Sequence, residues 1–326
     1  MKIFVSAHRD GLNGHRCVEI LGCTVIDFGY YPDDLSINTG QVRVSSLPSR
    51  EAATVDVSAL SQRIHNDWIY PPQMGVETPT TGEFRANPFP TRIFSLPRTH
   101  QITHTNLDSD DQLEFHIWSL SFFTGMRLTS TEAGFLDATP IKPNKLNDFV
   151  LLGDSLSASV ELAERFWCSN QNKPEQPKRF AAATHSLFLA QYPQALQFES
   201  FNYLYTALDS CYRIKACDKA FQRDISHPKR VKWLCEELGI DAPDWARPEN
   251  KETVLSKIRN PATHEGLYEQ EPLGFALHGI GDSNQNLNLE MQALICRLLV
   301  AIIASDSADY VRSPVNTRNQ HGLKLT

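Results

Sequence analysis

Apolar residues recur at helical spacing through the second half of the chain. Between residues 196 and 215, Phe198, Phe201, Leu204 and Leu208 follow one another at intervals of three or four, the spacing of a helix with one buried face. Similar stripes predict further helices over 179–191, 227–238, 251–264 and 286–305. Several helices joined by short loops predict a helical bundle in this half of the chain.

The first half of the chain has a different pattern, because its apolar residues occur in short runs. Residues 41–44 alternate polar and apolar side chains, which is the period of a half-buried strand, and strands are also expected at 3–5 and in a pair within 17–31. Proline, threonine and glycine predict long loops or turns over 71–97. Helices are predicted over 110–124 and 154–167, and further strands over 126–129 and 149–152. The expected fold class is therefore α+β, a mixed, β-rich N-terminal domain followed by an all-α bundle.

The clearest break in the chain lies at residues 169–178. This stretch is polar, contains Pro174 and Pro177 and has no apolar periodicity, so a linker or surface loop is expected. The expected organisation is an α+β N-terminal domain over 1–168, a helical bundle over 179–310 and a polar, frayed tail over 311–326.

Composition narrows the class of protein. The chain has 326 residues, of which 41% are hydrophobic and 21% charged, as in ordinary folded proteins. Its formal net charge is -7. Proteins that coat nucleic acid without specificity are usually basic, so this class is disfavoured and any nucleic-acid contact must be a local patch.

Cysteine usage and hydropathy suggest a cytoplasmic protein. The 7 cysteines include no Cys-x-x-Cys pair and no N-terminal leader is recognisable, so reduced thiols in a cytoplasm are expected. The most apolar window, 293–304, is interrupted by Arg297 and is too short to cross a bilayer. We therefore expect a core helix there and no membrane partner.

Candidate chemistry lies near the end of the predicted 251–264 helix, at Arg259, Asn260 and His264. Arginine is a permanent cation whose planar donor fork suits phosphate, and histidine exchanges its proton near neutral pH. Together they suit phosphodiester cleavage without a metal. The spacing alone is common in this chain, and only Arg259 is followed by asparagine. The other matches considered are Arg9 with His15, Arg98 with His104, and Arg179 with His185.

This segment resembles the motif of the HEPN superfamily of RNases, in which an arginine, usually followed by a polar residue, precedes a histidine by four to six residues. As in that family, the match lies in the next-to-last helix of a helical region, directly before a long apolar helix. Glu265 separates His264 from Gly266, and Pro261 interrupts the helix, and these are the two departures. The alternative is an ordinary helix C-terminus, where cationic side chains and a capping glycine are favoured.

The resemblance covers roughly residues 180–305. Residues 198–212 look like the opening helix of the ApeA-like HEPN group, and 229–240 look like its middle helix. Residues 115–125 are similar to the region that precedes HEPN in ApeA-like proteins, which are implicated in bacterial anti-phage defence. HEPN toxins that pair with nucleotidyltransferase antitoxins carry a tyrosine two residues after the histidine, where this chain has Gly266.

The resemblance implies a cytoplasmic, homodimeric endoribonuclease with a composite site, acting in prokaryotic anti-phage defence. His264 would act as general base or acid, Arg259 would stabilise charge on the phosphate, and Asn260 would orient the histidine or the scissile group. Attack by the ribose 2′-hydroxyl would leave a 2′,3′-cyclic phosphate, so RNA is the expected substrate and no cofactor or metal is expected. The N-terminal domain would sense a phage-derived or host trigger. The alternative is a non-catalytic HEPN-fold dimerisation or interaction module whose N-terminal domain binds a ligand or protein.

A local basic patch is consistent with an RNA partner. Residues 213–232 contain seven basic residues against two acids, so phosphate contacts are possible there, although a solvated helix face is an equal alternative. The candidate RNA-binding residues are Arg213, Lys215, Lys219, Arg223, Lys229, Arg230 and Lys232.

Two further pairs of residues are weaker candidates. Glu199 and Asp209 lie on the predicted opening helix and could face the motif, although exposure to solvent is the simpler expectation. His100 and His104 have the i, i+4 spacing of metal ligands on a helix, but the sequence around them predicts no helix and offers no third ligand. A metal site is therefore not expected.

Overall fold

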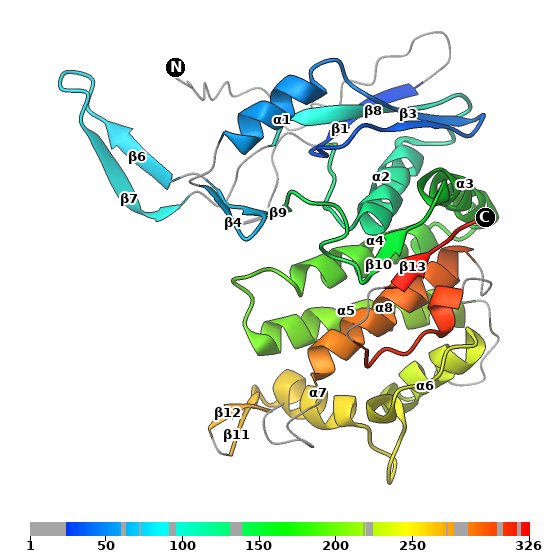
Figure 1. Ribbon diagram of the computed structural model, residues 1–326. Coiled ribbons are helices and arrows are strands. Elements are labelled where there is room, and N and C mark those ends of the chain that lie inside the picture. The colour runs from blue at the N-terminus through cyan, green and yellow to red at the C-terminus, as the bar shows by residue number, and fades with distance from the viewer. Residues whose placement is uncertain are drawn as a thin grey trace.

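The protein is an α+β molecule in which a β-rich layer lies against a layer of helices (Figure 1). The computed structural model describes residues 24–59, 63–71, 73–90, 96–130, 139–217, 219, 224–271, 273–276, 286–304, 309–317 and 321–326. The strand expected at 3–5, the first part of the strands expected within 17–31, the pair Arg9 and His15, and Arg223 lie outside these residues. The predicted fold class is confirmed.

The main sheet has four antiparallel strands in the order β1-β8-β3-β2. These are β1 (Thr24–Gly29), β2 (Ser36–Asn38), β3 (Val42–Ser46) and β8 (Arg98–His104). The strand predicted over 41–44 is thus confirmed. Within the described residues β1 pairs with the distant β8, and the pairing expected within 17–31 stays a prediction because its first strand lies outside these residues.

Helix α2 (Asp110–Thr124) has the predicted bounds and lies between the sheet and the bundle. Leu113 and Ile117 pack in the cluster that contains the apolar residues of the sheet. Phe115 and Phe122 pack in the larger cluster of the bundle. A helix that buries several sides in this way must be apolar around most of its circumference, and α2 is.

Gly125 ends α2 in the left-handed region, with φ 62°. A Cβ atom there would lie 2.7 Å from the Cα atom of Asn144, so both the conformation and the close approach require glycine. The strand expected over 126–129 is wrong, because Thr129 makes only an isolated bridge with Gly29.

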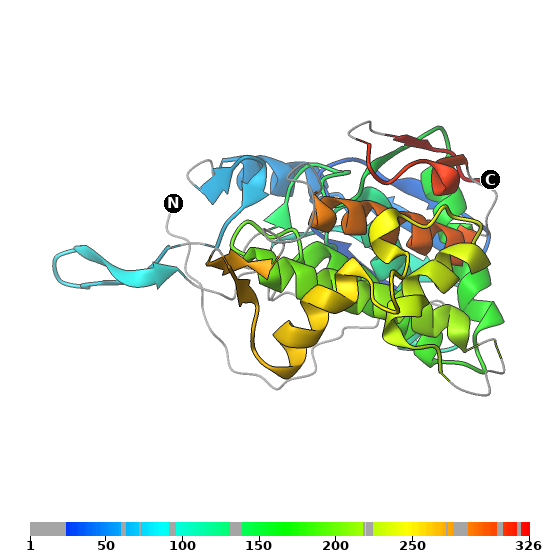
Figure 2. The same ribbon diagram turned by 90° about the horizontal axis from the view of Figure 1, so that it is seen from below.

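A β-hairpin replaces the long loops expected over 71–97. Strands β6 (Gln73–Glu77) and β7 (Phe84–Pro90) pair with each other and project away from the rest of the molecule (Figures 1 and 2). Val76 and Phe84 are exposed. The side chains described between residues 75 and 87 are all at least partly exposed, so this part of the hairpin lacks the apolar alternation by which strands are predicted.

Smaller elements complete the N-terminal half. Helix α1 (Arg50–Ser58) lies beside the sheet, and β4 (Ile64–His65), β5 (Trp68–Ile69) and β9 (Thr139–Pro140) form a three-stranded sheet.

The helices of the bundle follow the predicted order, with bounds that differ by a few residues. They are α3 (Ser155–Ser169), α4 (Glu175–Leu189), α5 (Gln197–Ala216), α6 (His227–Glu237), α7 (Val254–His264) and α8 (Leu287–Ala304). The break expected over 169–178 is too long, since α4 already begins at Glu175. Pro174 caps α4 and Pro177 lies in its first turn, where a missing N–H costs no helical hydrogen bond.

Helix α8 is the central helix of the bundle and is apolar on all sides. It spans 18 residues and is long and apolar enough to cross a membrane. The apolar window of 293–304 in the sequence is shorter than this helix. Its packing is that of a core helix, because 67% of its residues are buried and they contact α3, α4 and α5.

The polar tail expected over 311–326 is in part ordered structure. A 3-10 helix covers Asp309–Arg312, and β13 (His321–Leu323) pairs in parallel with β10 (Phe149–Leu151) (Figure 1). Leu323 and Leu325 are buried. The chain end therefore closes against a strand that lies far earlier in the sequence.

Two hydrophobic clusters share elements across the expected domain boundary. Val160 of α3 belongs to the cluster of the sheet, whereas Leu162 and Ala163 of the same helix belong to the cluster of the bundle. The domain boundary near residues 168–179 stays a prediction. Helices α2 and α3 precede it in the sequence, and each contributes residues to both clusters.

Candidate active site

Helix α7 carries the predicted motif and begins at Val254, three residues later than expected. Asn250 and Lys251 have positive φ angles of 49° and 75° and cannot continue a helix. Thr253 then caps the helix. Its hydroxyl accepts from the N–H of Ser256 at 3.2 Å, and the hydroxyl of Ser256 accepts from the N–H of Thr253 at 2.9 Å. This capping box fixes the start of the helix.

Pro261 lies inside α7 without ending it. It lies one turn from the C-terminus, so only the bond to the carbonyl of Lys257 is lost, and Lys257 is exposed to water. The Pro261 carbonyl accepts from the N–H groups of Glu265 at 3.0 Å and Leu267 at 3.1 Å. Gly266, with φ 68°, then turns the chain away, which is the expected capping role.

The structure brings Arg259, Asn260 and His264 into direct contact. Arg259 Nη1 donates to His264 Nε2 at 2.9 Å and to Asn260 Oδ1 at 3.2 Å. A guanidinium can only donate, so His264 Nε2 is an acceptor and the neutral ring carries its proton on Nδ1. His264 and Asn260 are exposed, and Arg259 is half-buried. Asn260 therefore orients the arginine in this structure, and it is linked to the histidine only through Arg259.

Arg259 also lines a cavity of about 480 Å³ between α5, α6 and α7. Its Cζ atom lies 5.7 Å from the ring centroid of Tyr205 on α5. Other lining residues include Asn202, Thr206, Asp209, His227 and Ala262. The motif thus borders a cavity with both hydrogen-bonding and charged groups, large enough for part of a nucleotide.

His227, the first residue of α6, was not predicted as a site residue. Its Nδ1 atom lies 2.8 Å from the hydroxyl oxygen of Tyr205 and 3.3 Å from Nη1 of Arg230. Burial and the nearby cations Arg230 and Arg259 lower the pKa of His227 below its usual value. A signal for it existed in the sequence, because Arg223 and His227 also have the loose arginine–histidine spacing.

Arg230 has a structural position, although it was a candidate RNA-binding residue. It is only 6% exposed, it donates to Asp209, and its Nη2 atom donates to Asp224 at 2.9 Å. It therefore ties α6 to α5 at the edge of the cavity. Of the two acids considered, Asp209 does border the motif, whereas Glu199 accepts from the N–H of Leu196 at 2.8 Å and caps α5.

The remaining candidate RNA-binding residues are spread over several environments. Arg213 pairs with Asp224 at 3.1 Å, Lys219 with Glu237 at 2.7 Å, and Lys232 with Glu236 at 3.6 Å. Lys229 is exposed on α6, and Lys215 lines a different cavity. Much of the positive charge of this segment is therefore balanced locally.

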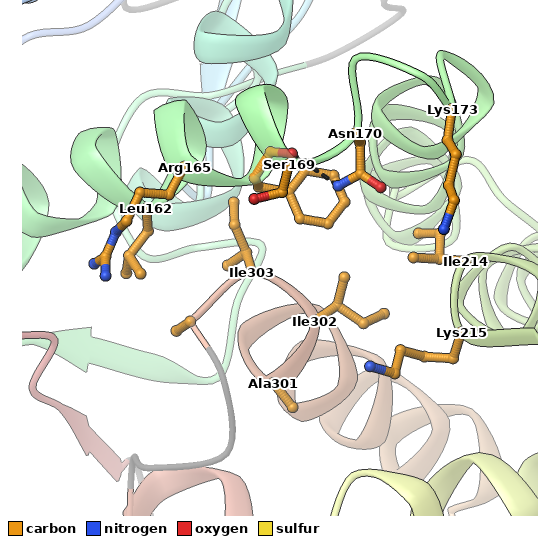
Figure 3. Close-up of a pocket in the computed structure, with 12 residues that line it drawn as sticks. Leu162, Arg165, Ser169, Asn170, Lys173, Ile214, Lys215, Ala301, Ile302 and Ile303 are labelled. Atoms are coloured by element: carbon orange, nitrogen blue, oxygen red, sulfur yellow. Dashed lines mark hydrogen bonds between the residues drawn. The ribbon is translucent and has the colours of Figure 1, made fainter. Parts of the chain in front are cut away.

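That second cavity, of about 390 Å³, lies where α3, α5 and α8 end (Figure 3). Arg165, Lys173 and Lys215 line it, together with apolar residues of α8. Helix C-termini carry partial negative charge, and cationic side chains stabilise them. Lys215 lies in the last turn of α5 and is favoured there by the helix dipole. This cavity contains no residue of the motif, so it is a weaker candidate for the site.

His100 and His104 do not share a site. His100 Nε2 lies 3.1 Å from Ser46 Oγ and 3.0 Å from the carbonyl oxygen of Asp33, and burial lowers the pKa of His100 to about 4. His104 instead meets His116 and Glu164, whose ligand-type atoms all lie within 4.8 Å of one another. His116 comes from α2 and Glu164 from α3, so the two groups that join His104 are distant from it in sequence.

The hydrogen bonds of this cluster identify Glu164 as an acceptor of several donors. The N–H of Asn106 donates to His104 Nδ1 at 3.1 Å, so neutral His104 carries its proton on Nε2, 3.3 Å from Glu164 Oε2. The side-chain amide of Gln112 donates to both oxygens of Glu164, at 3.1 and 3.0 Å. A metal would need the Nε2 lone pair that this arrangement protonates. We therefore interpret the cluster as a hydrogen-bond network that joins β8, α2 and α3.

Comparison of the chain with known protein families, with curated proteins and with solved structures gives no match in any of the three. The assignment of function therefore depends on the geometry of the residues themselves.

Proposed function

We propose that the protein is a metal-independent endoribonuclease of the HEPN type that acts as a homodimer in the cytoplasm. The observation that carries the proposal is the 2.9 Å contact between Arg259 Nη1 and His264 Nε2 at the exposed end of α7. A phosphate-binding cation and a proton-transfer group are thereby held together beside a cavity. The long apolar helix α8 follows α7, as the motif's resemblance to HEPN RNases requires.

The proposed reaction is cleavage by the ribose 2′-hydroxyl. His264 of one copy takes the 2′-hydroxyl proton once Nε2 leaves Arg259, and the 2′-oxygen attacks the adjacent phosphorus. The P–O5′ bond breaks, and the 5′-oxygen takes a proton from a second, protonated His264. Arg259 stabilises the negative charge on the phosphate oxygens, and Asn260 holds Arg259 in place. The products are a 2′,3′-cyclic phosphate and a 5′-hydroxyl.

A second copy is proposed because the resemblance to HEPN RNases implies a composite site in a dimer. Each copy offers one exposed motif histidine, so two copies would supply both a base and an acid. Exposed apolar side chains around the same end of the bundle support a dimer interface there. They include Leu196, Leu267, Leu273 and Leu289.

Contacts of neighbouring residues place Leu196, Leu267 and Leu289 near one another. Tyr268, next to Leu267, stacks on Phe198 at 4.4 Å between ring centroids. Asn288, next to Leu289, donates to the carbonyl of Gln197 at 3.2 Å. The apolar patch therefore spans the start of α5, the end of α7 and the start of α8. A C2 dimer through it would bring two copies of the motif toward one axis.

The N-terminal half is proposed to sense a phage-derived or host trigger, in keeping with a role in anti-phage defence. Its support is that an unregulated RNase would damage its own cell. The alternative function is a non-catalytic interaction module, which the exposed leucine patch would also suit.

Cleavage of RNA by the purified full-length protein tests the proposal. We expect RNA to be cut without added metal and with EDTA present, leaving 2′,3′-cyclic phosphate ends, and DNA of the same sequence to remain intact. His264→Ala and Arg259→Ala should each lower the rate at least about a hundredfold. His65→Ala, an exposed histidine on β4, is the matched control and should cleave like the wild type. Equal activity of the wild type and His264→Ala would sink the proposal.

Mixed dimers test the composite site separately. After subunit exchange between equal amounts of wild type and His264→Ala, only about one quarter of C2 dimers contain two wild-type copies. A composite site then predicts about one quarter of the wild-type activity, whereas independent sites predict about one half. A stable dimer that never cuts RNA, in any trigger condition, would favour the interaction module.

A further inference from the structure

The cavity beside the motif contains a second histidine, His227, whose protonation state the structure defines. Nη1 of Arg230 lies 3.3 Å from His227 Nδ1, and a guanidinium nitrogen can only donate a hydrogen bond. Nδ1 is therefore an acceptor, and the Tyr205 hydroxyl, 2.8 Å away, donates to it as well. The neutral ring must carry its proton on Nε2.

The partners of His227 are themselves held rigidly. Arg230 is 6% exposed and is anchored by Asp209, by Asp224 and by the carbonyl of Ile225 at 3.0 Å. The rings of Tyr205 and His227 meet edge to edge through the hydrogen bond of the hydroxyl to Nδ1, with centroids 6.3 Å apart and an angle of 24° between the planes. The orientation of the imidazole is thus fixed from two sides before any ligand binds.

The free edge of the ring has hydrogen-bonding capacity to offer. Within the part of the chain that the structure describes, Nε2 of His227 has no hydrogen-bond partner, and His227 lines the cavity that Arg259 also lines. The one acid among the lining residues, Asp209, is already paired with Arg230. The cavity therefore presents the Arg259 cation and an N–H donor, with its carboxylate compensated.

We propose that His227 binds a backbone phosphate of the RNA through Nε2–H, in the cavity that Arg259 also lines. Tyr205 and Arg230 act as positioning residues that hold the proton on Nε2. The inference deepens the proposed function and rests on it for the choice of RNA as the ligand. It assigns His227 to substrate binding and leaves proton transfer to His264.

The charges around His227 favour a neutral ring that donates a hydrogen bond over a charged ring that transfers a proton. Burial lowers the pKa of His227, and the cations Arg230, Arg259 and Arg213 lower it further, while Asp209 opposes them. The ring is therefore neutral at neutral pH and has no second proton to give to a leaving group. A neutral histidine of this kind can still polarise or bind a negatively charged oxygen.

Nitrogen-15 NMR of histidine side chains in the full-length protein tests the tautomer and the ligand together. His227→Gln assigns the signal. We expect a protonated Nε2 and an unprotonated Nδ1 at neutral pH. Addition of a DNA oligonucleotide of the same sequence as the RNA should shift the Nε2 signal. It keeps the backbone phosphates but cannot be cut, because it lacks the 2′-hydroxyl. Tyr205→Phe should allow the other tautomer to populate without unfolding the protein.

Affinity for the same oligonucleotide, measured by fluorescence anisotropy, gives the energetic readout. His227→Ala should weaken binding about ten- to a hundredfold, the range for a hydrogen bond to a charged group. His227→Gln, which keeps an N–H donor, should recover part of that loss, and His65→Ala should bind like the wild type. Circular dichroism and thermal unfolding of each variant separate a binding defect from misfolding.

The outcomes distinguish this inference from the nuclease proposal. If RNA is cut in a His264-dependent way but neither the Nε2 signal nor the affinity depends on His227, the inference is overturned and the nuclease stands. If His227-dependent binding is found without any cleavage, the phosphate site stands and the catalytic proposal fails. A His227→Ala enzyme that loses only the alkaline limb of its pH–rate profile, with unchanged affinity, would make His227 a general acid and overturn the inference.

Discussion

Arg297 of α8 donates from Nη1 to Asp148 Oδ2 at 2.7 Å across 149 positions of the chain. Arg297 is fully buried. Its other nitrogens donate to the carbonyls of Ser313 at 2.7 Å and Pro314 at 3.0 Å, and the hydroxyl of Tyr310 donates to Asp148. One guanidinium thus joins the loop before β10, the central helix and the chain end. Arg297, the charged residue within the apolar window 293–304, therefore has a structural role.

Removal of the carboxylate at 148 should destabilise the fold strongly, because it leaves the buried Arg297 cation without its counter-ion. We expect Asp148→Ala to lower the free energy of unfolding by about 3–5 kcal/mol. Asp56→Ala, at an exposed position of α1, is the control and should change it by less than about 0.5 kcal/mol. Urea unfolding followed by circular dichroism measures both, and equal effects would refute the structural role of the pair.

The network of Glu164 with His104, His116 and Gln112 should make the fold acid-sensitive. Burial lowers the pKa of His116, so the unfolded chain gains that proton first, and stability falls as pH drops below about 6.5. The three hydrogen-bond donors lower the pKa of Glu164 despite its burial, so stability falls further as pH drops below its unfolded value, about 4.3. His116 and Glu164 therefore both lower the stability of the fold as pH drops.

Glu164→Gln tests this network. An amide at 164 turns an N–H toward existing donors, and we expect a loss of about 2–4 kcal/mol of stability at pH 7.5. Because the Glu164 carboxylate raises the pKa of His116 against the effect of burial, its removal should also make the melting temperature fall more steeply as pH drops from 7.5 to 4.5. EDTA should leave the melting temperature of the wild type unchanged. A fall in melting temperature with EDTA, reversed by added zinc, would instead show that the cluster holds a metal.

The capping box of Thr253 should control how well α7 presents the motif. Thr253→Ala removes the acceptor for the N–H of Ser256 and should cost about 1 kcal/mol of stability. Thr253→Ser keeps the hydroxyl and should be close to the wild type. Differential scanning calorimetry compares the two, and RNA cleavage should fall more for the alanine variant because Arg259 and His264 lie on the same helix. Identical melting temperatures of Thr253→Ala and Thr253→Ser would show that the capping hydroxyl does not stabilise α7.

The exposed leucines near the motif should mediate dimerisation. A charge at Leu267, which is 55% exposed, would remain solvated in a monomer but would be buried in the proposed interface. Leu267→Glu should therefore shift the protein from dimer to monomer in analytical ultracentrifugation and abolish cleavage, while its circular dichroism spectrum should match that of the wild type. Val55→Glu, at the similarly exposed Val55 on α1, is the matched control and should stay dimeric. A Leu267→Glu protein that remains dimeric would place the interface elsewhere.

The periodic helices were the most predictable part of the fold. The apolar spacing of α2, α5 and α6 predicted their positions to within a residue or two, because a helix face is defined by neighbours three and four positions apart. The sequence also indicated which arginine and histidine to consider, since Arg259, Asn260 and His264 lie within one helical turn and a half. Their direct contact is a short-range property that spacing alone can suggest.

Longer-range relationships were not predictable in this way. The pairing of β1 with β8, the projecting hairpin and the pairing of β13 with β10 follow no local pattern, because strand partners are chosen by packing across many residues. For the same reason, neither Tyr205 nor His227 stood out as a site residue.

The sequence by itself determined the α+β class, most helix positions and the three residues of the motif, since these depend on local periodicity and side-chain chemistry. Only the tertiary structure decided what surrounds the motif. It buried Arg230 against two carboxylates, placed His227 and Tyr205 beside Arg259, and gathered His104, His116 and Glu164 into one network. The physical reason is that the burial and pairing of a charge depend on which distant helices pack against it, and no short segment encodes that choice.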